Sequence, residues 1–202
     1  MPDRIFQSTE SIISLYKKYG GELYFGEGVT QLQHALQAAH LAKANGGDSD
    51  NGGDSETILA AFLHDIGHLC IDETDEHQVM DSYGVVDHET LGANFLRKMG
   101  FSNKVCRLIA SHVNAKRYLT YKFPEYYEQL SEPSKRTLEF QGGKMTPSEA
   151  KDFQEDKYFE RYIQLRKWDE MAKSEIPVVE NMDEIRQLIY SHLEQNLKSS
   201  SL

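Results

Sequence analysis

The sequence is poor in the features that mark secreted and membrane proteins. Its two cysteines, Cys70 and Cys106, are too few for a disulfide scaffold and fit free thiols in a reducing compartment. No stretch approaches the roughly 20 apolar residues of a membrane-spanning helix, and the opening residues MPDRIFQSTES lack the apolar segment of a secretory signal. We therefore expect a cytoplasmic protein without a membrane partner.

Basic residues are scarce relative to acidic ones. The 22 lysines and arginines face 32 acidic residues, which gives a formal net charge of −10, and the chain has no Lys/Arg-rich run. Such a chain lacks the positive charge that binding to a nucleic-acid backbone requires, so we expect no nucleic-acid partner. A small anion can still bind where a few basic side chains converge.

Alternating β-branched runs and internal repeats are also missing, and apolar residues recur at helical spacing instead. This pattern predicts an all-α fold, a single helical bundle that spans residues 1–202. The helices are expected at about 10–19, 30–44, 56–69, 87–99, 102–113, 158–173 and 182–197, and two more are expected to start at the N-caps Ser131 and Thr146. A Gly-rich loop is predicted at 45–56, with Ser55 as the N-cap of the helix that follows. The final helix is expected to pack on the bundle.

The stretch AAFLHDIGHL, residues 60–69, places polar side chains in a helix that is otherwise apolar. Each of them costs free energy to bury without a partner. Histidine and aspartate recur on other predicted helices, and the set of candidate metal ligands is His34, His64, Asp65, His88, His112 and Asp169. Imidazole and carboxylate suit first-row transition metals. Asp65 can bridge two ions, whose charges would offset its burial.

Two basic residues are in helical phase with these candidate ligands. Lys116 follows His112 by four residues, and Arg166 precedes Asp169 by three, so each pair shares a helix face. Ser134 lies in the first turn of a predicted helix, where free N–H groups favour an anion. The alternative is that Lys116 and Arg166 are solvated surface charges. The phasing favours an anion pocket beside the metals.

The order H…HD…H…H…D between residues 34 and 169 resembles the HD-domain superfamily of metal-dependent helical proteins, and its two extra histidines resemble the dinuclear branch. Further stretches resemble the PhnZ-type oxygenases, which are mixed-valent diiron enzymes that cleave the C–P bond of 1-hydroxyphosphonates with O2. These stretches are YFGEGVTQLQHALQAA (24–39), HDIGHL (64–69), GVVDHETLGANFLRKMGFS (84–102), HVNAKRYL (112–119), YYEQLSEPSKRTLEFQGGKM (126–145) and LRKWDEMAK (165–173). The resemblance implies one HD domain whose metal-binding core covers about 30–173.

The resemblance also implies a role for each matching residue. One iron would be bound by His34, His64, Asp65 and Asp169, and the second by Asp65, His88 and His112. The phosphonate group would be bound by Lys116, Ser134, Thr137 and Arg166. Tyr24 would occupy the substrate position until substrate arrives, and Glu27 would contact the amino group of the substrate. His68 would neighbour the substrate, although by chemistry alone it could also orient a ligand or bind metal.

Three functions remain open at this stage. The resemblance implies an oxygenase acting on (R)-2-amino-1-hydroxyethylphosphonate to give glycine and phosphate, or on its trimethylammonium analogue to give glycine betaine. A separate hydroxylase would then be the metabolic partner that makes the 1-hydroxyphosphonate. The second function is an HD-type phosphohydrolase that uses a metal-activated hydroxide. The third is a catalytically silent HD module that senses a ligand.

Overall fold

The computed structural model describes residues 2–45, 54–70, 79–178 and 181–199, and helices dominate it. In these segments the chain forms ten α-helices and one short 3-10 helix but no β-strand, which confirms the predicted all-α class. Two isolated β-bridges join Leu23 to Thr30 and Val79 to Val85. None of the helices described has both the length and the apolar character that a membrane crossing requires.

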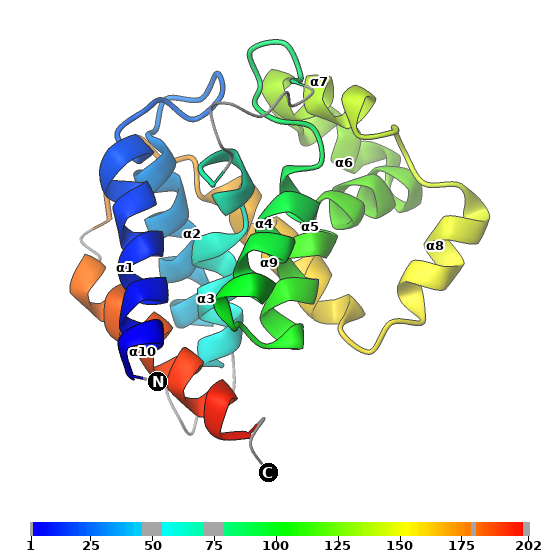
Figure 1. Ribbon diagram of the computed structural model, residues 1–202. Coiled ribbons are helices and arrows are strands. Elements are labelled where there is room, and N and C mark those ends of the chain that lie inside the picture. The colour runs from blue at the N-terminus through cyan, green and yellow to red at the C-terminus, as the bar shows by residue number, and fades with distance from the viewer. Residues whose placement is uncertain (1, 46–53, 71–78, 179–180, 200–202) are drawn as a thin grey trace.

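The helices surround one main core, and Figure 1 shows α1, α2 and α10 on one side and α6, α7 and α8 on the other, with α4 and α5 between them. Their bounds are α1 (Pro2–Tyr19), α2 (Gln31–Asn45), α3 (Ser55–Leu63), η1 (Ile66–His68), α4 (His88–Met99), α5 (Asn103–Lys122), α6 (Pro124–Gln129), α7 (Glu132–Phe140), α8 (Pro147–Gln154), α9 (Phe159–Met171) and α10 (Met182–Ser199).

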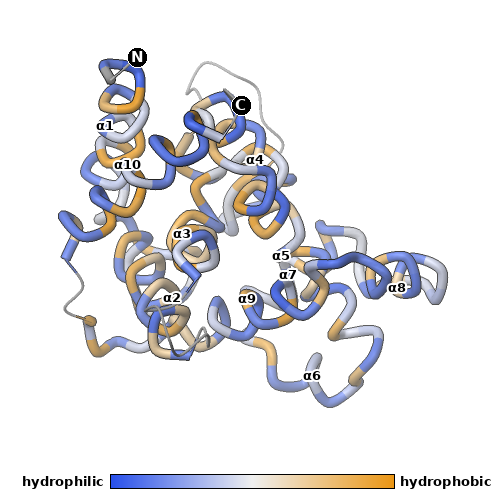
Figure 2. Tube along the Cα trace, turned by 90° about the horizontal axis from the view of Figure 1, so that it is seen from below, coloured by the Kyte–Doolittle hydropathy of each residue, from blue (hydrophilic) through white to orange (hydrophobic). Residues whose placement is uncertain are grey.

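Helix α3 lies at the centre of the bundle. It packs against α2, α5, α9 and α10, and Ala60, Ala61, Phe62 and Leu63 are completely buried. A helix that is apolar on all sides must be covered on all sides, so its sequence dictates this position. Figure 2 shows the contrast between the hydrophobic stretches of α2 and α3 and the largely hydrophilic α8 at the periphery.

The predicted continuous helix over 56–69 is wrong at its C-terminal end. Helix α3 ends at Leu63, His64 is its C-cap, and Asp65 leaves the helical conformation with φ −101° and ψ 9° before η1 begins. The metal-ligand candidates His64 and Asp65 therefore lie in a turn between two helices. Periodicity did not reveal this break because the apolar pattern continues through Ile66 and Leu69, both of which are buried.

Close packing between η1 and α4 accounts for the break. A Cβ atom on Gly67 would overlap the backbone carbonyl of His88, and one on Gly92 would lie 2.9 Å from the Gly67 nitrogen. Two glycines facing each other let the two backbones approach to this distance. The contact brings the end of α3 beside the start of α4, where His88 lies.

Helices α1 and α5 extend further than the sequence predicted. Helix α1 begins at Pro2, and α5 continues to Lys122 because Tyr118 and Leu119 are buried in a small second core with Met145 and Ala150. The short α6 was not predicted. Helix α10 forms as expected and packs against α1 and α3. The loop predicted at 45–56 lies mostly outside the described residues.

Asp54, rather than the predicted Ser55, is the N-cap of α3. Its carboxylate accepts hydrogen bonds from the Glu56 backbone N–H at 3.2 Å and the Thr57 hydroxyl at 2.7 Å, and it pairs with Lys104 on α5. Burial raises the pKa of Asp54, but the bonds from Lys104 and Thr57 outweigh this effect and lower the pKa below its usual value. This side chain therefore fixes the central helix to α5.

We expect Asp54→Ala to lower the free energy of unfolding by about 1–2 kcal/mol, because the cap is lost. Asp152→Ala, at an exposed position on α8, is the control and should change it little. Urea unfolding at pH 7 measures both variants. Equal stability of the wild type and Asp54→Ala would contradict the assignment of Asp54 as a stabilising cap.

Asp54→Asn keeps a capping side chain and removes only the charge. Because the folded-state pKa of Asp54 is lowered, its charge stabilises the protein fully above the pKa of the unfolded state, about 4. That contribution is lost as the pH falls through the folded-state pKa. The stability difference between wild type and Asp54→Asn should therefore shrink in acid, and a difference independent of pH would contradict this account.

Candidate metal centre

Two groups of three potential metal ligands lie next to each other in the interior. The first group is His34 on α2, His64 at the end of α3 and Asp169 on α9, and the second is Asp65, His88 on α4 and His112 on α5. Within each group the donor atoms lie within 4.8 Å of one another. The structure thus brings together all six ligand candidates from the sequence, carried by elements that are far apart along the chain.

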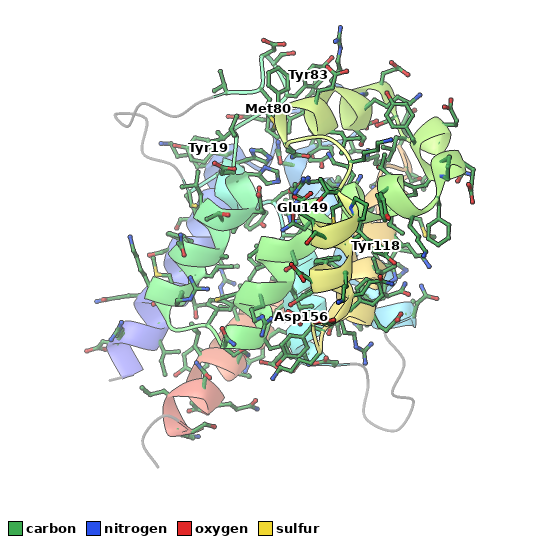
Figure 3. The ribbon with its side chains drawn as sticks, turned by 90° about the vertical axis from the view of Figure 1, so that its right-hand side faces the viewer. Tyr19, Met80, Tyr83, Tyr118, Glu149 and Asp156 are labelled. Carbon is green, nitrogen blue, oxygen red and sulfur yellow. The ribbon has the colours of Figure 1, made fainter. Side chains whose placement is uncertain are left out.

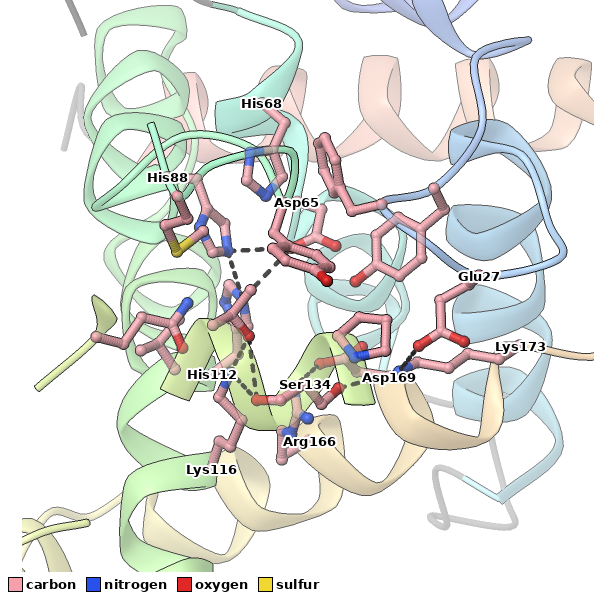
Figure 4. Close-up of a pocket in the computed structure, with 18 residues that line it drawn as sticks. Glu27, Asp65, His68, His88, His112, Lys116, Ser134, Arg166, Asp169 and Lys173 are labelled. Carbon is pink, nitrogen blue, oxygen red and sulfur yellow. Dashed lines mark hydrogen bonds and ion pairs between the residues drawn. The ribbon is translucent and has the colours of Figure 1, made fainter. Parts of the chain in front are cut away.

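The carboxylate of Asp65 lies between the two groups, and its oxygens face different histidine pairs. Figure 4 shows Asp65 together with His88 and His112. Oδ2 is 3.6 Å from Nε2 of His34 and 3.3 Å from Nε2 of His64. Oδ1 is 3.3 Å from Nε2 of His88 and 3.4 Å from Nε2 of His112. This is the arrangement that a carboxylate bridging two cations requires.

In all four of these histidines, Nδ1 forms a hydrogen bond with the backbone. Each Nδ1 lies near a backbone carbonyl, and the pairs are His34 with Ala172 at 2.9 Å, His64 with Ala61 at 2.8 Å, His88 with Val85 at 3.3 Å and His112 with Ile109 at 2.8 Å. A carbonyl oxygen only accepts, so each neutral ring carries its proton on Nδ1 and a lone pair on Nε2. This is the tautomer that binds metal through Nε2.

The lone pairs of these histidines face one another in pairs. The Nε2 atoms of His34 and His64 are 3.1 Å apart, and those of His88 and His112 are 3.0 Å apart. In addition, Oδ2 of Asp65 and Oδ1 of Asp169 are buried without a hydrogen-bond partner, which is costly for carboxylate oxygens. Donors bound to one ion at about 2.0–2.2 Å are separated by roughly 3.0–3.6 Å. The residues therefore fit two cations.

Arg166 holds Asp169 in place on α9. Its Nη1 hydrogen-bonds to Oδ2 of Asp169, its Nε donates to Glu170 at 2.9 Å, and its Nε also lies 3.2 Å from the hydroxyl of Tyr126. The sequence analysis assigned Arg166 to the anion alone. The structure shows an arginine that pairs with two carboxylates while it also lines the cavity beside the metal ligands.

A cavity of about 40 Å³ opens directly onto the ligand groups (Figure 4). All seven predicted catalytic and substrate-binding residues line it, namely Tyr24, Glu27, His68, Lys116, Ser134, Thr137 and Arg166. So do Asp65, His88, His112 and Asp169. Met80 and Tyr83 complete one wall, and Figure 3 shows them close together at one end of the molecule. The cavity has room for a few water molecules, which is the scale of a small ligand.

Lys116 reaches this cavity from α5, four residues beyond His112. Its Nζ donates to Oγ1 of Thr137 at 2.8 Å and lies 3.4 Å from the carbonyl of Ser134. Burial, reinforced by the nearby Arg166, lowers the pKa of Lys116 well below its usual value. An anion in the cavity would favour the protonated form and recover part of this cost. The alternative hypothesis that Lys116 is a solvated surface residue is wrong, because its exposed fraction is 3%.

Tyr24 and His68 contact the ligand histidines from outside the two groups. The ring of Tyr24 stacks on His34 with centroids 3.9 Å apart, and burial together with Asp65 raises the pKa of its hydroxyl. The Nδ1 of His68 accepts a hydrogen bond from the Val85 N–H at 3.2 Å, so its proton is on Nε2. This protonation favours a hydrogen-bonding role for His68 over a third-ligand role.

Lys173, which lies just beyond the end of α9, was not predicted as a site residue. Its Nζ donates to Oε1 of Glu27 at 2.7 Å and to the hydroxyls of Ser134 at 3.1 Å and Ser131 at 3.2 Å. Lys173 lines the cavity together with Glu27 and Ser134. Lys173 follows Asp169 by four residues, as Lys116 follows His112. The same helical spacing could therefore have identified Lys173 from the sequence.

Comparison with known proteins identifies the class. The HD domain family matches residues 32–155, which is more than half of the chain, so the chain belongs to the HD-domain family. Three curated relatives align over most of its length. One is a hydroxymethylphosphonate dioxygenase from Gimesia maris, 39% identical over 93% of this chain and 90% of the relative.

The second relative is a [1-hydroxy-2-(trimethylamino)ethyl]phosphonate dioxygenase (glycine-betaine-forming) from Leisingera caerulea, 36% identical over 81% of this chain and 79% of the relative. The third is an uncharacterised protein of Acanthamoeba polyphaga mimivirus, 38% identical over 96% of this chain and 85% of the relative. Within the HD-domain family the chain is thus an oxygenase of the PhnZ type, which confirms the resemblance seen in the sequence.

We expect Asp65→Ala to lose both metal ions, because this carboxylate faces both histidine pairs. Asp169→Ala removes a ligand from the first group alone, so this variant should lose the ion of that group and keep about one ion per chain. Elemental analysis of reconstituted, desalted protein measures the metal content, with Asp152→Ala as the control. Retention of two ions per chain by Asp65→Ala would show that Asp65 is not the bridge.

Proposed function

We propose that the protein uses O2 to cleave the C–P bond of a 1-hydroxyphosphonate. The observation that carries this proposal is that two potential metal-binding groups open onto a cavity lined by Lys116, Ser134 and Thr137. The names of the two curated dioxygenases support the reaction class. The reaction balances, because one 1-hydroxyphosphonate dianion and one O2 give a carboxylate and dihydrogen phosphate.

We infer that the cofactor is a pair of iron ions in the mixed-valent Fe(II)/Fe(III) state. Imidazole and carboxylate donors suit iron among the first-row metals. His34, His64, Asp65 and Asp169 would hold one ion, and Asp65, His88 and His112 the other. When bound, the iron pair supplies the O2 activation and the redox chemistry, for which the side chains of the protein have no equivalent.

The chain itself binds and orients the substrate. Lys116, Ser134 in the first turn of α7 and Thr137 one turn further along would bind the phosphonate oxygens. With the phosphonate fixed at this end of the cavity, C1 and its hydroxyl point toward the ligand groups. The surrounding buried side chains limit the access of water to the reacting carbon.

Tyr24 must leave its place over His34 for a substrate to reach the first ligand group. It begins a tight turn in which the Glu27 N–H donates to the Tyr24 carbonyl at 2.7 Å, and Gly26 has φ +83°. This positive φ suits glycine, and a Cβ atom there would approach Cγ of Pro133 to 3.0 Å. We infer that the Tyr24 side chain leaves this place when substrate binds, while Glu27 stays paired with Lys173.

The candidate substrates differ in what C1 carries. The sequence favoured (R)-2-amino-1-hydroxyethylphosphonate, giving glycine and phosphate, with the trimethylammonium analogue giving glycine betaine as its close competitor. Hydroxymethylphosphonate, named for the Gimesia maris relative, carries only hydrogen there. Each of them needs a separate hydroxylating enzyme that introduces the 1-hydroxyl group, and this enzyme is the expected metabolic partner.

Anaerobic reconstitution with iron tests the proposal. Phosphate release from these 1-hydroxyphosphonates is then measured with and without O2. We expect phosphate only when O2 is added, in proportion to the O2 consumed. Phosphate release that persists without O2, or in protein loaded only with zinc, magnesium or manganese, would instead establish an HD-type phosphohydrolase.

Lys116→Met tests the anion pocket and should raise KM by about 10- to 100-fold, because a charge-assisted contact to the phosphonate is lost. Metal content should not change, since Lys116 belongs to neither ligand group. Lys122→Met, at an exposed position on the same helix, is the matched control. Steady-state phosphate release measures all three proteins. An unaltered KM in Lys116→Met would remove this lysine from the pocket.

A further inference from the structure

One end of the cavity is closed by the ion pair between Glu27 and Lys173. Their side chains are 15% and 16% exposed, and Nζ lies 2.7 Å from Oε1. The Ser131 hydroxyl donates to the same oxygen at 2.7 Å. Figure 4 shows the pair meeting beside the metal ligands, with Glu27 coming from the turn before α2 and Lys173 from the end of α9. The negative charge of Glu27 is therefore already balanced by the positive charge of Lys173.

This pair changes what Glu27 can recognise. A free carboxylate in a cavity attracts a substrate ammonium group, which is the role that the family resemblance implies for Glu27. Here a positively charged substituent would have to displace Lys173 or share the carboxylate with it. Sharing brings two like charges together in a partly buried place, where their repulsion is weakly screened. A substituent without charge meets no such penalty.

The size of the cavity favours the same conclusion. With Tyr24 in place its volume is about 40 Å³, which favours a small substrate. Phe25 and Met80 also line it and offer apolar contact to an uncharged substituent.

We propose that Lys173 determines the substrate specificity of this protein. By neutralising Glu27 it selects 1-hydroxyphosphonates whose C1 carries hydrogen or a small uncharged group, of which hydroxymethylphosphonate is the smallest. This assignment rests on the proposed function, and it replaces the expectation from the sequence that Glu27 receives the amino group of the substrate.

The test compares kcat/KM for hydroxymethylphosphonate and (R)-2-amino-1-hydroxyethylphosphonate within each iron-loaded variant. The wild type should prefer the uncharged substrate by about tenfold or more. Lys173→Met frees the Glu27 carboxylate and should shift the ratio toward the aminated substrate by about tenfold. Lys173→Arg keeps the charge and should retain the wild-type preference. A loss of folded or metal-loaded enzyme lowers both efficiencies alike, so it leaves the ratio unchanged.

The double variant Glu27→Gln with Lys173→Met is the matched control. It lacks the freed carboxylate, so its ratio should return toward the wild-type value. Anaerobic titration calorimetry of the same two compounds gives the binding preference independently of turnover. Wild-type preference for the aminated substrate, or equal ratios in Lys173→Met and Lys173→Arg, would overturn the proposal while phosphate release with O2 still upheld the proposed function. Absence of that release from both compounds would overturn both.

Discussion

The structure depends on one buried carboxylate placed between two pairs of histidines. Asp65 could not remain charged at this depth without positive charge on both sides, because burial alone would raise its pKa. The helices α2, α4, α5 and α9 each contribute a ligand candidate that faces this centre or its neighbour. Packing of the bundle and formation of the site are therefore one event, with the apolar α3 as the element that places Asp65.

The surrounding chain fixes the orientation of each donor before any ion binds. Backbone carbonyls hold the four histidine rings in the tautomer whose lone pair points inward, and Arg166 holds Asp169 from its other side. The close contact of η1 with α4 aligns the turn that carries Asp65. Outside the ligands, buried Lys116 and the Lys173 that pairs with Glu27 bring two basic side chains into the cavity of a protein whose net charge is −10. The convergence of basic groups at one place thus does not require a basic protein.

Much of this could be predicted from the sequence, because helix periodicity places residues such as His112 and Lys116 on one face. The all-α class followed from the same periodicity, and the family from the resemblance carried by the order of the His and Asp residues and by the stretches around them. The break after Leu63 could not be predicted, since it arises from the contact between Gly67 and Gly92, which are remote in sequence. The ion pair between Glu27 and Lys173 joins residues still further apart in the sequence, and no periodicity links them. Both of these features are tertiary contacts, and both shape the site.

Electron paramagnetic resonance of the iron-reconstituted protein, poised at one oxidising equivalent per two irons, tests the central claim most directly. A carboxylate bridge couples the spins of the ions it joins, so we predict the signal of an antiferromagnetically coupled Fe(II)/Fe(III) pair. Adding a 1-hydroxyphosphonate should shift this signal if, as proposed, the substrate binds at the pair. Signals from isolated, uncoupled iron, unchanged by the phosphonate, would contradict a centre bridged by Asp65.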